Sequence, residues 1–226
     1  YIPVTKELVR RVARRRGVRA TFMPKPFASI SGSGMHLHIS LRREEGSNLF
    51  WGGRGLSDQA LSFIAGILEH ARGICVFVAP TVNSYKRLVP GHEAPTYICW
   101  GFANRSALIR IPPARREEEC RIEFRASDPS CNPYLALAAV LAAGLDGMRK
   151  GLDPGDPLEG SAYELRGVEC LPGSLGEAIE EARRDPLLRE VMGSELLEAF
   201  LKEREEEWEE YRLHVTEWEI ERYVDC

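Results

Sequence analysis

The sequence lacks several features that would point to common classes of protein. Its six cysteines form no Cys-x-x-Cys pair, which argues against a zinc site and for reduced thiols in a cytoplasm; they are Cys75, Cys99, Cys120, Cys131, Cys170 and Cys226. No apolar run is long enough to span a bilayer, and no signal-peptide pattern opens the chain. The net charge of −4 gives no reason to expect a nucleic-acid partner. We therefore expect a cytoplasmic globular protein with no membrane or nucleic-acid partner.

What is present is typical of a soluble globular chain. The 226 residues are 44% apolar and 28% charged, enough for one large domain or a domain with an appendage. The chain starts at Tyr1 rather than Met and already in mid-pattern, so we expect it to be the later part of something longer. Apolar spacing, capping residues and Pro/Gly breaks predict helices over 2–16, 58–78, 134–148, from 175, and over 194–223, and strands over 20–23, 35–41, 97–100, 107–111 and 121–125.

The last of these strands carries an unusual combination of charges. Its sequence is R-I-E-F-R, so the two apolar residues share one face and the three charged residues share the other, about 6.6 Å apart. Two fixed cations around Glu123 are costly to bury without partners. Such a face suits a site that handles phosphates, carboxylates and a metal, since Arg grips planar oxyanions and a carboxylate ligates Mg²⁺ or Mn²⁺. Taken alone, the pattern also fits an exposed strand with weak ion pairs.

A second polar strand face is predicted over 35–41. His36, His38 and Ser40 lie on one face of this strand, and the residues between them are apolar. A Gly-rich loop over 29–34 precedes it and allows a ligand to approach the backbone closely. Two histidines two residues apart on a strand can reach one site, although an isolated H-x-H pair is a weak metal signal.

Further polar residues come from two other segments. The stretch 81–96 has little periodicity and many polar side chains; such loops are often functional, and the alternative is a plain surface connection. Arg105 and Arg110 lie at the start and near the end of the strand predicted over 107–111. Together the four segments supply five arginines, one clear candidate for a carboxylate ligand and two histidines. That number of arginines suits a phosphate passing between acceptor oxygens, where positioning and charge neutralisation supply most of the catalysis.

Several of these segments closely resemble glutamine synthetase. The resemblance covers nearly the whole chain in order, through ATFMPKP (20–26), GSGMHLH (32–38), NSYKRLVPGHEAP (83–95), NRSALIRIP (104–112), RIEFR (121–125) and residues 128–147. The tail looks most like the bacterial and archaeal alpha-type enzymes, notably at LPGSL (171–175) and VTEWE (215–219).

The resemblance implies the fold and the assembly. The fold would be α+β, a glutamine synthetase/guanido kinase-like catalytic domain with a curved antiparallel sheet, flanking helices and a helical C-terminal tail. Residues 1–150 would be the C-terminal part of that domain and 151–226 its helical extension, with the N-terminal β-grasp domain absent. The family forms a dodecamer of two stacked hexameric rings with active sites between subunits, so this homo-oligomer is the expected state of the full-length enzyme.

The resemblance also implies a reaction, the ATP-dependent ligation of ammonia to L-glutamate. ATP phosphorylates the side-chain carboxylate of glutamate, and ammonia then displaces phosphate from γ-glutamyl phosphate, with Mg²⁺ or Mn²⁺ as cofactor. The matching positions imply these roles: metal binding for His36 and Glu123; ATP binding for His38, Ser40, Arg105 and Arg121; stabilisation of the transferring phosphoryl for Arg110 and Arg125; glutamate binding for Gly32, Arg87, Arg110 and Arg125; and deprotonation of ammonium by Glu93, in the flap that closes over the intermediate.

Three departures from the family pattern weaken or limit this interpretation. Ser31 replaces an Asn that helps to hold the substrate amine, and His92 replaces an aromatic residue before the flap Glu. The N-terminal half of the family's length, with the remaining carboxylate ligands of both metals and an Asp lent to the neighbour's site, is missing. We therefore expect that the chain alone does not build the second metal site.

Two alternatives and one possible regulatory site remain at this stage. A γ-glutamyl ligase for another amine is the first alternative, but such relatives often lose the flap Glu, and Glu93 is present. An inactive truncated remnant with a structural role is the second, and the complete set of site residues argues against long decay. Tyr163 lies near the position that is adenylylated in beta-type relatives, but its flanking residues do not match, so we expect an ordinary surface tyrosine.

Overall fold

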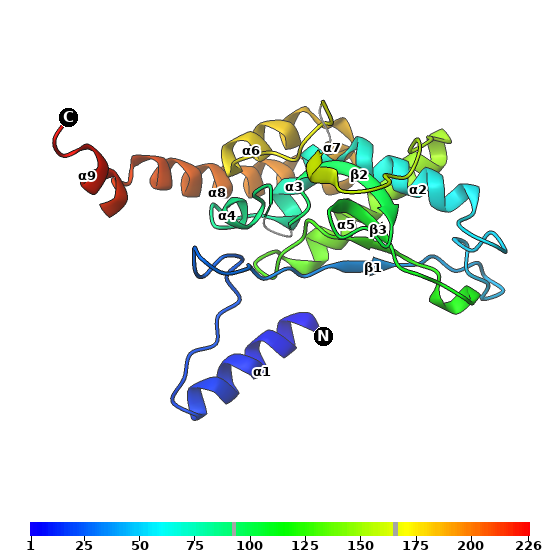
Figure 1. Ribbon diagram of the computed structural model, residues 1–226, viewed down its shortest axis with the longest axis horizontal. Helices are drawn as coiled ribbons and strands as arrows, with labels where there is room; N and C mark the ends of the chain where they lie inside the picture. The colour runs from blue at the N-terminus through cyan, green and yellow to red at the C-terminus, as the bar shows by residue number, and fades with distance from the viewer. Residues whose placement is uncertain (92–93, 165–166) are drawn as a thin grey trace.

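The computed structural model describes residues 1–91, 94–164 and 167–226 (Figure 1). In chain order, the elements within these residues are α1 (Ile2–Arg15), β1 (Leu37–Ile39), α2 (Asp58–Glu69), α3 (Ala71–Val78), α4 (Ser84–Arg87), β2 (Tyr97–Phe102), β3 (Ala107–Ile111), η1 (Glu117–Glu119), β4 (Ile122–Phe124), α5 (Pro133–Lys150), η2 (Ala162–Glu164), α6 (Leu175–Arg184), α7 (Pro186–Met192), α8 (Ser194–Leu213) and α9 (Glu217–Tyr223). Several helices and one sheet make up the α+β class that the sequence predicts, and the fold class is confirmed.

The four strands form one sheet in the order β1-β4-β3-β2. β4 pairs antiparallel with β1 and with β3, as expected, but β2 and β3 run parallel, so the sheet is mixed rather than antiparallel. Tyr97 faces Ala107 and Phe102 faces Ile111, which means that residues 103–106 travel back along the sheet before β3 begins. Alternation in the sequence predicts strands but carries no information on their relative direction.

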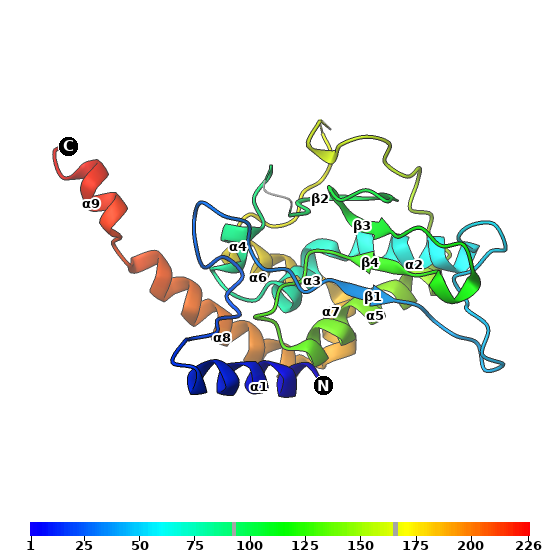
Figure 2. The same ribbon diagram turned by 60° about the horizontal axis from the view of Figure 1, so that its bottom comes forward.

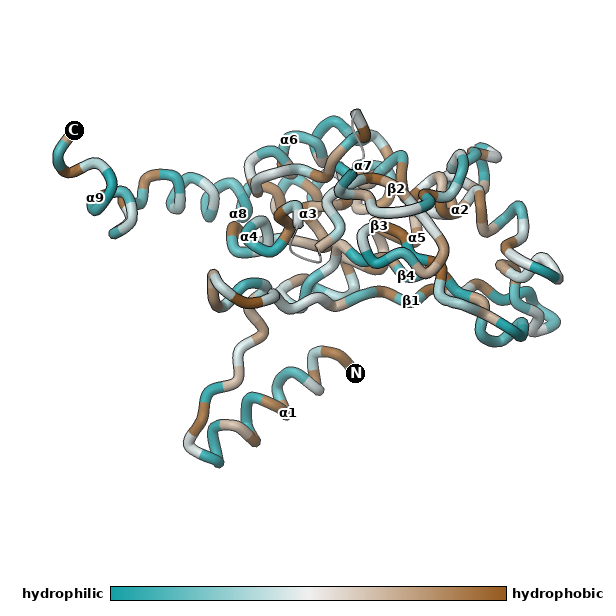
Figure 3. Tube along the Cα trace, in the orientation of Figure 1, coloured by the Kyte–Doolittle hydropathy of each residue, from teal (hydrophilic) through white to brown (hydrophobic). Residues whose placement is uncertain are grey.

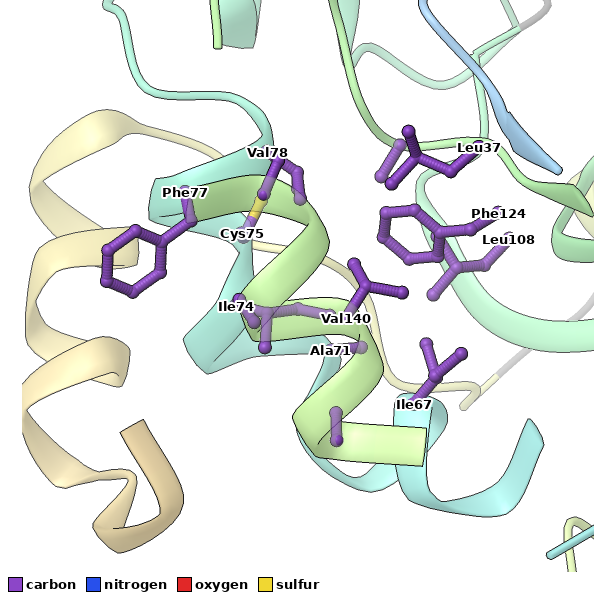
Figure 4. Packing of buried hydrophobic residues seen from close by; sticks show 14 of the residues in the cluster. Leu37, Ile67, Ala71, Ile74, Cys75, Phe77, Val78, Leu108, Phe124 and Val140 are labelled. Carbon is purple, nitrogen blue, oxygen red and sulfur yellow. The ribbon is translucent and has the colours of Figure 1, made fainter. Parts of the chain in front are cut away.

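The core lies between one face of the sheet and the helices. Figure 4 shows Leu37, Leu108 and Phe124 of the sheet pointing toward Val140 of α5 and Ile67 of α2. All five side chains are buried in one apolar cluster, which also includes residues of α6, α7 and α8. Burying these side chains removes about 25 cal/mol of unfavourable hydration for each square ångström of apolar surface. This packing fixes one face of the sheet and leaves the other for polar groups.

Helices α2 and α5 approach each other closely because glycines line their contact. A Cβ at Gly66 would lie 2.1 Å from the Ala143 carbonyl oxygen, and one at Gly147 would lie 2.2 Å from the Ser62 carbonyl oxygen. No side chain fits at either position without moving backbone. α5 is the next element after β4, the strand that carries Glu123. It begins where Asn132 accepts a hydrogen bond from the Tyr134 amide.

Some predicted elements differ from those observed. The helix predicted over 58–78 is two helices, α2 and α3, which meet at His70 at an angle of 77°. The helix predicted over 194–223 is likewise divided into α8 and α9, and α7 was not predicted. Residues 20–23 form no strand, and the strand predicted over 35–41 has only three residues, Leu37–Ile39. Hydrophobic periodicity continues through His70, because it does not register the contacts that His70 makes with Asp146 and Asp185 far along the chain.

The two ends of the chain lie outside the compact body (Figures 1 and 2). No residue of α1 is buried, and hydrophobic positions recur along it (Figure 3). Its contacts with the rest of the protein include a hydrogen bond from Lys6 Nζ to the Pro129 carbonyl, 2.5 Å long. Within the described residues, no single helix has the length and apolar character to cross a membrane; α2 and α3 pass that test only as a bent pair.

Candidate functional site

The polar face of the sheet is built around Glu123, at the centre of β4. The strand register places Glu123 beside His38 of β1 and Arg110 of β3. Ile122 and Phe124 on either side are buried in the core, so Glu123 is turned to the opposite face, as the alternation predicts. Leu37 and Ile39 are buried while His38 and Ser40 are exposed, which is the alternation predicted for β1.

Glu123 is the shared acceptor of a group that we call the sheet cluster: His36, Arg110, Glu123 and Arg125. Arg110 Nη1 donates to Glu123 Oε2 at 2.6 Å, and Arg125 Nη1 donates to Oε1 at 2.9 Å. His36 Nδ1 lies 2.9 Å from the same Oε1. Glu123 is only 3% exposed, and burial alone would raise its pKa; the hydrogen bond and charge of Arg110, with the charge of Arg125, instead hold the pKa below its ordinary value. The carboxylate is therefore ionised at neutral pH.

His36 responds in the opposite sense to most histidines beside a carboxylate. Burial and the charges of Arg125 and Arg87 lower its pKa, and Glu123 offsets only part of that effect. The imidazole is therefore neutral at pH 7, which is the form that ligates a metal. His36 and Glu123 thus present a nitrogen and a carboxylate donor at one point, next to two guanidinium groups.

A cavity of about 970 Å³ opens beside the sheet cluster. It brings together five of the predicted site residues, namely Gly32, His36, Arg87, Arg105 and Arg125. Residues 102–106 and 157–161 supply much of the remaining lining, together with Ser31 and Tyr163. The cavity is large enough for a small ligand or a nucleotide and is lined by three guanidinium groups, so it suits an anion.

Arg87 and Gly32 lie close together in the lining of this cavity. Arg87 is 6% exposed, and its guanidinium donates to the carbonyls of Ala126 at 2.8 Å and Arg125 at 3.1 Å. Burial, chiefly, lowers the Arg87 pKa, although the group stays charged at neutral pH. A Cβ at Gly32 would lie 2.4 Å from the Pro24 carbonyl oxygen and 3.1 Å from Arg87 Cγ, so only glycine allows the loop to pass there.

The other predicted site residues that the structure describes, His38, Ser40, Arg110, Arg121 and Glu123, do not line the cavity. Arg121 Nε donates to His38 Nδ1 at 3.3 Å, and Arg121 Nη1 donates to the Glu119 carbonyl at 2.8 Å. Ser40 follows β1 on the same face and is exposed. The predicted base Glu93 and its neighbour His92 lie outside the described residues.

Three features of the structure were not predicted, two in the cavity lining and one away from it. The first is a hydrogen-bonded pair, Asn104 and Ser106, in the cavity wall; its signal is an Asn followed two residues later by Ser, a spacing typical of an Asx turn. The second is Tyr163, predicted to be an ordinary surface residue, which is half-buried and lines the cavity. The third is a buried group that we call the helix cluster, formed by His70, Asp146 and Asp185.

In the helix cluster, His70 joins three helical segments. Its Nδ1 lies 2.8 Å from Asp185 Oδ2, between α6 and α7, and its Nε2 lies 3.1 Å from Asp146 Oδ2 on α5. Burial lowers the His70 pKa, but the hydrogen bonds and charges of the two carboxylates outweigh it and raise the pKa above its ordinary value. Lys150 also pairs with Asp146 at 2.5 Å. None of these residues lines the large cavity.

Comparison with known proteins identifies the family. A family model described as "Glutamine synthetase, catalytic domain" matches residues 1–223. The chain belongs to the glutamine synthetase family. It is 51% identical to a glutamine synthetase of Thermococcus kodakarensis over 96% of this chain and 53% of that protein. It is also 48% identical to a glutamine synthetase of Thermus thermophilus, over 99% of this chain and 52% of that protein.

Solved structures share the fold. The structure named "GmaS/ADP complex-Conformation 1" is 42% identical and superimposes with a TM-score of 0.92, covering 100% of this chain and 54% of that one. The structure named "Apo GmaS without ligand" superimposes with a TM-score of 0.89 at 42% identity. The chain therefore spans about half the length of the glutamine synthetases that it matches. The resemblance stated from the motifs is confirmed.

Proposed function

We propose that this chain carries part of the active site of an enzyme that joins ammonia to L-glutamate at the expense of ATP, through γ-glutamyl phosphate. The observation that carries the proposal is the sheet cluster: one buried carboxylate, Glu123, held between Arg110 and Arg125 and touched by His36, at the edge of a cavity lined by further arginines. Family membership and a relative whose structure is named as an ADP complex support nucleotide use.

In this proposal the guanidinium groups stabilise the negative charge of the phosphoryl group. The transferring phosphoryl spreads negative charge over its oxygens, and preorganised cations stabilise that charge without reorganising. Arg110 and Arg125 are fixed by their bonds to Glu123, so they would meet the phosphoryl already in position. Arg105 and Arg121, with His38 and Ser40, would hold ATP.

Glutamate would bind deeper in the cavity, near Arg87 and Gly32. The Arg87 side chain reaches the backbone that leads from Arg125, so the groups for the amino acid and for the phosphoryl are held together. Glu93 would take a proton from ammonium once the intermediate has formed. This role rests on the motif match alone, since Glu93 lies outside the described residues.

His36 and Glu123 fit a divalent metal in part. Mg²⁺ and Mn²⁺ prefer oxygen donors, and Mg²⁺ commonly keeps water and substrate phosphates in most of its positions. Among the described residues there is no group of three or more His, Cys, Asp or Glu that could hold a metal ion. Two protein donors beside an anion-binding cavity therefore suit a metal completed by phosphate oxygens, whose chemistry would be to neutralise the phosphate charge. We propose Mg²⁺ or Mn²⁺ at this point, a dodecameric assembly and a cytoplasmic location for the whole enzyme.

The proposal is tested by ATP- and metal-dependent formation of γ-glutamyl hydroxamate from glutamate and hydroxylamine. The chain is assayed alone and after extension by the half of the relatives' length that it lacks, each with a Glu123→Ala control. We expect activity in the extended protein only, and its loss in the control. Activity of the chain alone would show that the metal ligands of the other half are dispensable, and inactivity of both proteins would refute the proposed function.

A further inference from the structure

Two segments far apart in the sequence, 102–106 and 157–161, make one wall of the cavity. The second segment has no strand and no α-helix, so its position depends on individual hydrogen bonds. Its Leu158 amide donates to the Trp100 carbonyl at 2.7 Å. A Cβ at Gly101 would lie 2.9 Å from the Leu158 carbonyl oxygen, which shows how closely the two segments approach.

Asn104 and Ser106 link the two segments through their side chains. Asn104 Nδ2 donates to the Gly160 carbonyl at 2.8 Å, and Asn104 Oδ1 accepts from the Ser106 amide at 3.0 Å and from Ser106 Oγ at 2.7 Å. Ser106 Oγ in turn accepts from the Ala162 amide at 2.8 Å. The hydrogen bonds run from Ala162 through Ser106 and Asn104 to Gly160, so the two side chains tie the C-terminal end of the wall segment to the turn.

Arg105 lies between these two anchored residues and lines the cavity. Within the described parts of the chain, its guanidinium has no hydrogen bond or ion pair, whereas Arg87, Arg110 and Arg125 are all engaged. A cation of this kind, exposed beside a cavity and fixed only at its backbone, is available to a ligand. Its placement depends on the turn that carries it.

The turn itself is strained. Ala103 has φ of 51°, and it is the one described residue other than glycine with a positive φ. L-residues with a Cβ rarely adopt this conformation, so surrounding contacts must hold it. The Ala103 amide donates to the Ile111 carbonyl at 2.9 Å on one side, and the Asn104 side chain fixes the other.

We propose that Asn104 is a positioning residue for the anion-binding side of this site. Its amide holds the strained turn and the wall segment together, and this directs the free guanidinium of Arg105 into the cavity toward a phosphate-bearing ligand. The proposal rests on the proposed function, in which Arg105 contacts ATP. Asn104 itself touches no reacting atom.

The test compares two matched substitutions in the extended protein. Asn104→Asp keeps the acceptor for Ser106 but removes the donor to Gly160. Because it also adds a negative charge beside the cavity, faster exchange of the wall amides, and not weaker ADP binding alone, shows the positioning role. Asn132→Asp makes the same change at the start of α5, where Asn132 Oδ1 accepts from the Tyr134 amide at 3.0 Å, the same turn geometry away from the cavity. Binding of ADP with Mg²⁺ is measured by calorimetry, and amide hydrogen exchange is followed at Leu158 and Ala162.

We expect Asn104→Asp to weaken ADP binding about tenfold, the scale of one lost hydrogen bond, and to speed exchange at both amides. KM for ATP should rise while kcat changes less than about threefold, because Arg105 is displaced and the sheet cluster is not. Asn132→Asp should change neither quantity.

The outcomes separate this inference from the function on which it rests. If the unsubstituted protein binds ADP and Asn104→Asp binds it equally well, Asn104 has no positioning role and the proposed function stands. If Asn104→Asp and Asn132→Asp weaken binding alike, the effect is general destabilisation and the inference is wrong. If the unsubstituted protein does not bind ADP with Mg²⁺, the proposed function is wrong, and the inference that rests on it is wrong as well.

Discussion

The protein holds two groups in which a histidine contacts one or two carboxylates, and the pKa values of their histidines shift in opposite directions. In the sheet cluster the His36 pKa is lowered, and in the helix cluster the His70 pKa is raised. Burial lowers both values, so burial is not the difference. His36 faces one carboxylate and several guanidinium groups, whereas His70 lies between Asp146 and Asp185. The sign of the surrounding charge decides the direction.

The surrounding charge also distinguishes a ligand-binding group from a structural one. The helix cluster balances its charges internally and lies among packed helices, so nothing further is needed to satisfy it. The sheet cluster has two guanidinium groups for one carboxylate and borders a large cavity. An excess of positive charge beside a cavity is costly without an anionic ligand. Charge balance and an adjoining cavity therefore distinguish the two groups better than the residue types do.

The largest expected effect is on activity, at Glu123. We expect Glu123→Gln to lower hydroxamate formation on the order of a thousandfold, the scale of losing one preorganised charged group at a reacting centre. Gln keeps the shape and one acceptor oxygen, but it does not hold Arg110 and Arg125 by charge or serve as a good metal ligand. The measurement is kcat/KM of the extended protein with Mg²⁺ and with Mn²⁺.

The control is the same substitution at Glu119, a half-buried residue paired at 2.7 Å with the exposed Arg116. We expect Glu119→Gln to retain activity within about twofold, because exposed ion pairs contribute little. Near-normal activity of Glu123→Gln would contradict the central role of the sheet cluster. A melting temperature that falls enough to explain the lost activity would place Glu123 with the helix cluster, as a structural group.

A smaller effect, this time on stability, is expected at Asp185. Asp185→Asn keeps the side-chain oxygen that caps α7, where Oδ1 accepts from the Leu187 amide at 3.0 Å, but removes the charge beside His70. We expect the free energy of unfolding to fall by about 1–3 kcal/mol in denaturant titrations, with ADP affinity changed less than about twofold. A loss of affinity as large as the loss of stability would mean that the helix cluster is coupled to the site.

The sequence predicts the parts of this protein that depend on local pattern. The alternation in R-I-E-F-R and H-x-H-x-S indicates which side chains face the core, and the burial of Ile122 and Phe124 confirms it. The family motifs predict the fold class, which is also confirmed. The break before α9 is readable too, since Thr216 and Glu219 form a capping box, a spacing visible in the sequence. The roles assigned to the individual site residues stay predictions.

The features that the sequence does not reveal depend on partners far along the chain. Hydrophobic periodicity continues through His70, and the break there coincides with contacts to Asp146 and Asp185, which are 76 and 115 residues away. Asn104 likewise meets Gly160, which is 56 residues away. The parallel direction of β2 and β3 follows from the path of residues 103–106, and no periodicity encodes it. Local propensity carries no information on such contacts, because tertiary packing decides them.

The smallest expected effect is the pH dependence of stability that the helix cluster causes. It tests directly whether the His70 pKa is raised while the His36 pKa is lowered. The folded-state pKa of His70 is raised above the ordinary value of about 6.5, so the folded state binds the proton more tightly than the unfolded chain. Its contribution to stability is present in full below about pH 6.5 and is lost as the pH rises through the folded-state pKa. Burial raises the Asp146 pKa, but Lys150 and His70 outweigh burial and lower it. The contribution of Asp146 to stability is therefore lost only in acid.

We therefore expect the difference in melting temperature between the unsubstituted protein and His70→Gln to be largest near pH 6 and to shrink steadily above it. Gln keeps a polar side chain of similar reach but does not gain a proton. His214→Gln, at the exposed end of α8, controls for loss of a histidine elsewhere and should show no such trend. A difference that grows with pH would mean that His70 is held neutral, as His36 is, and that the two carboxylates do not outweigh burial.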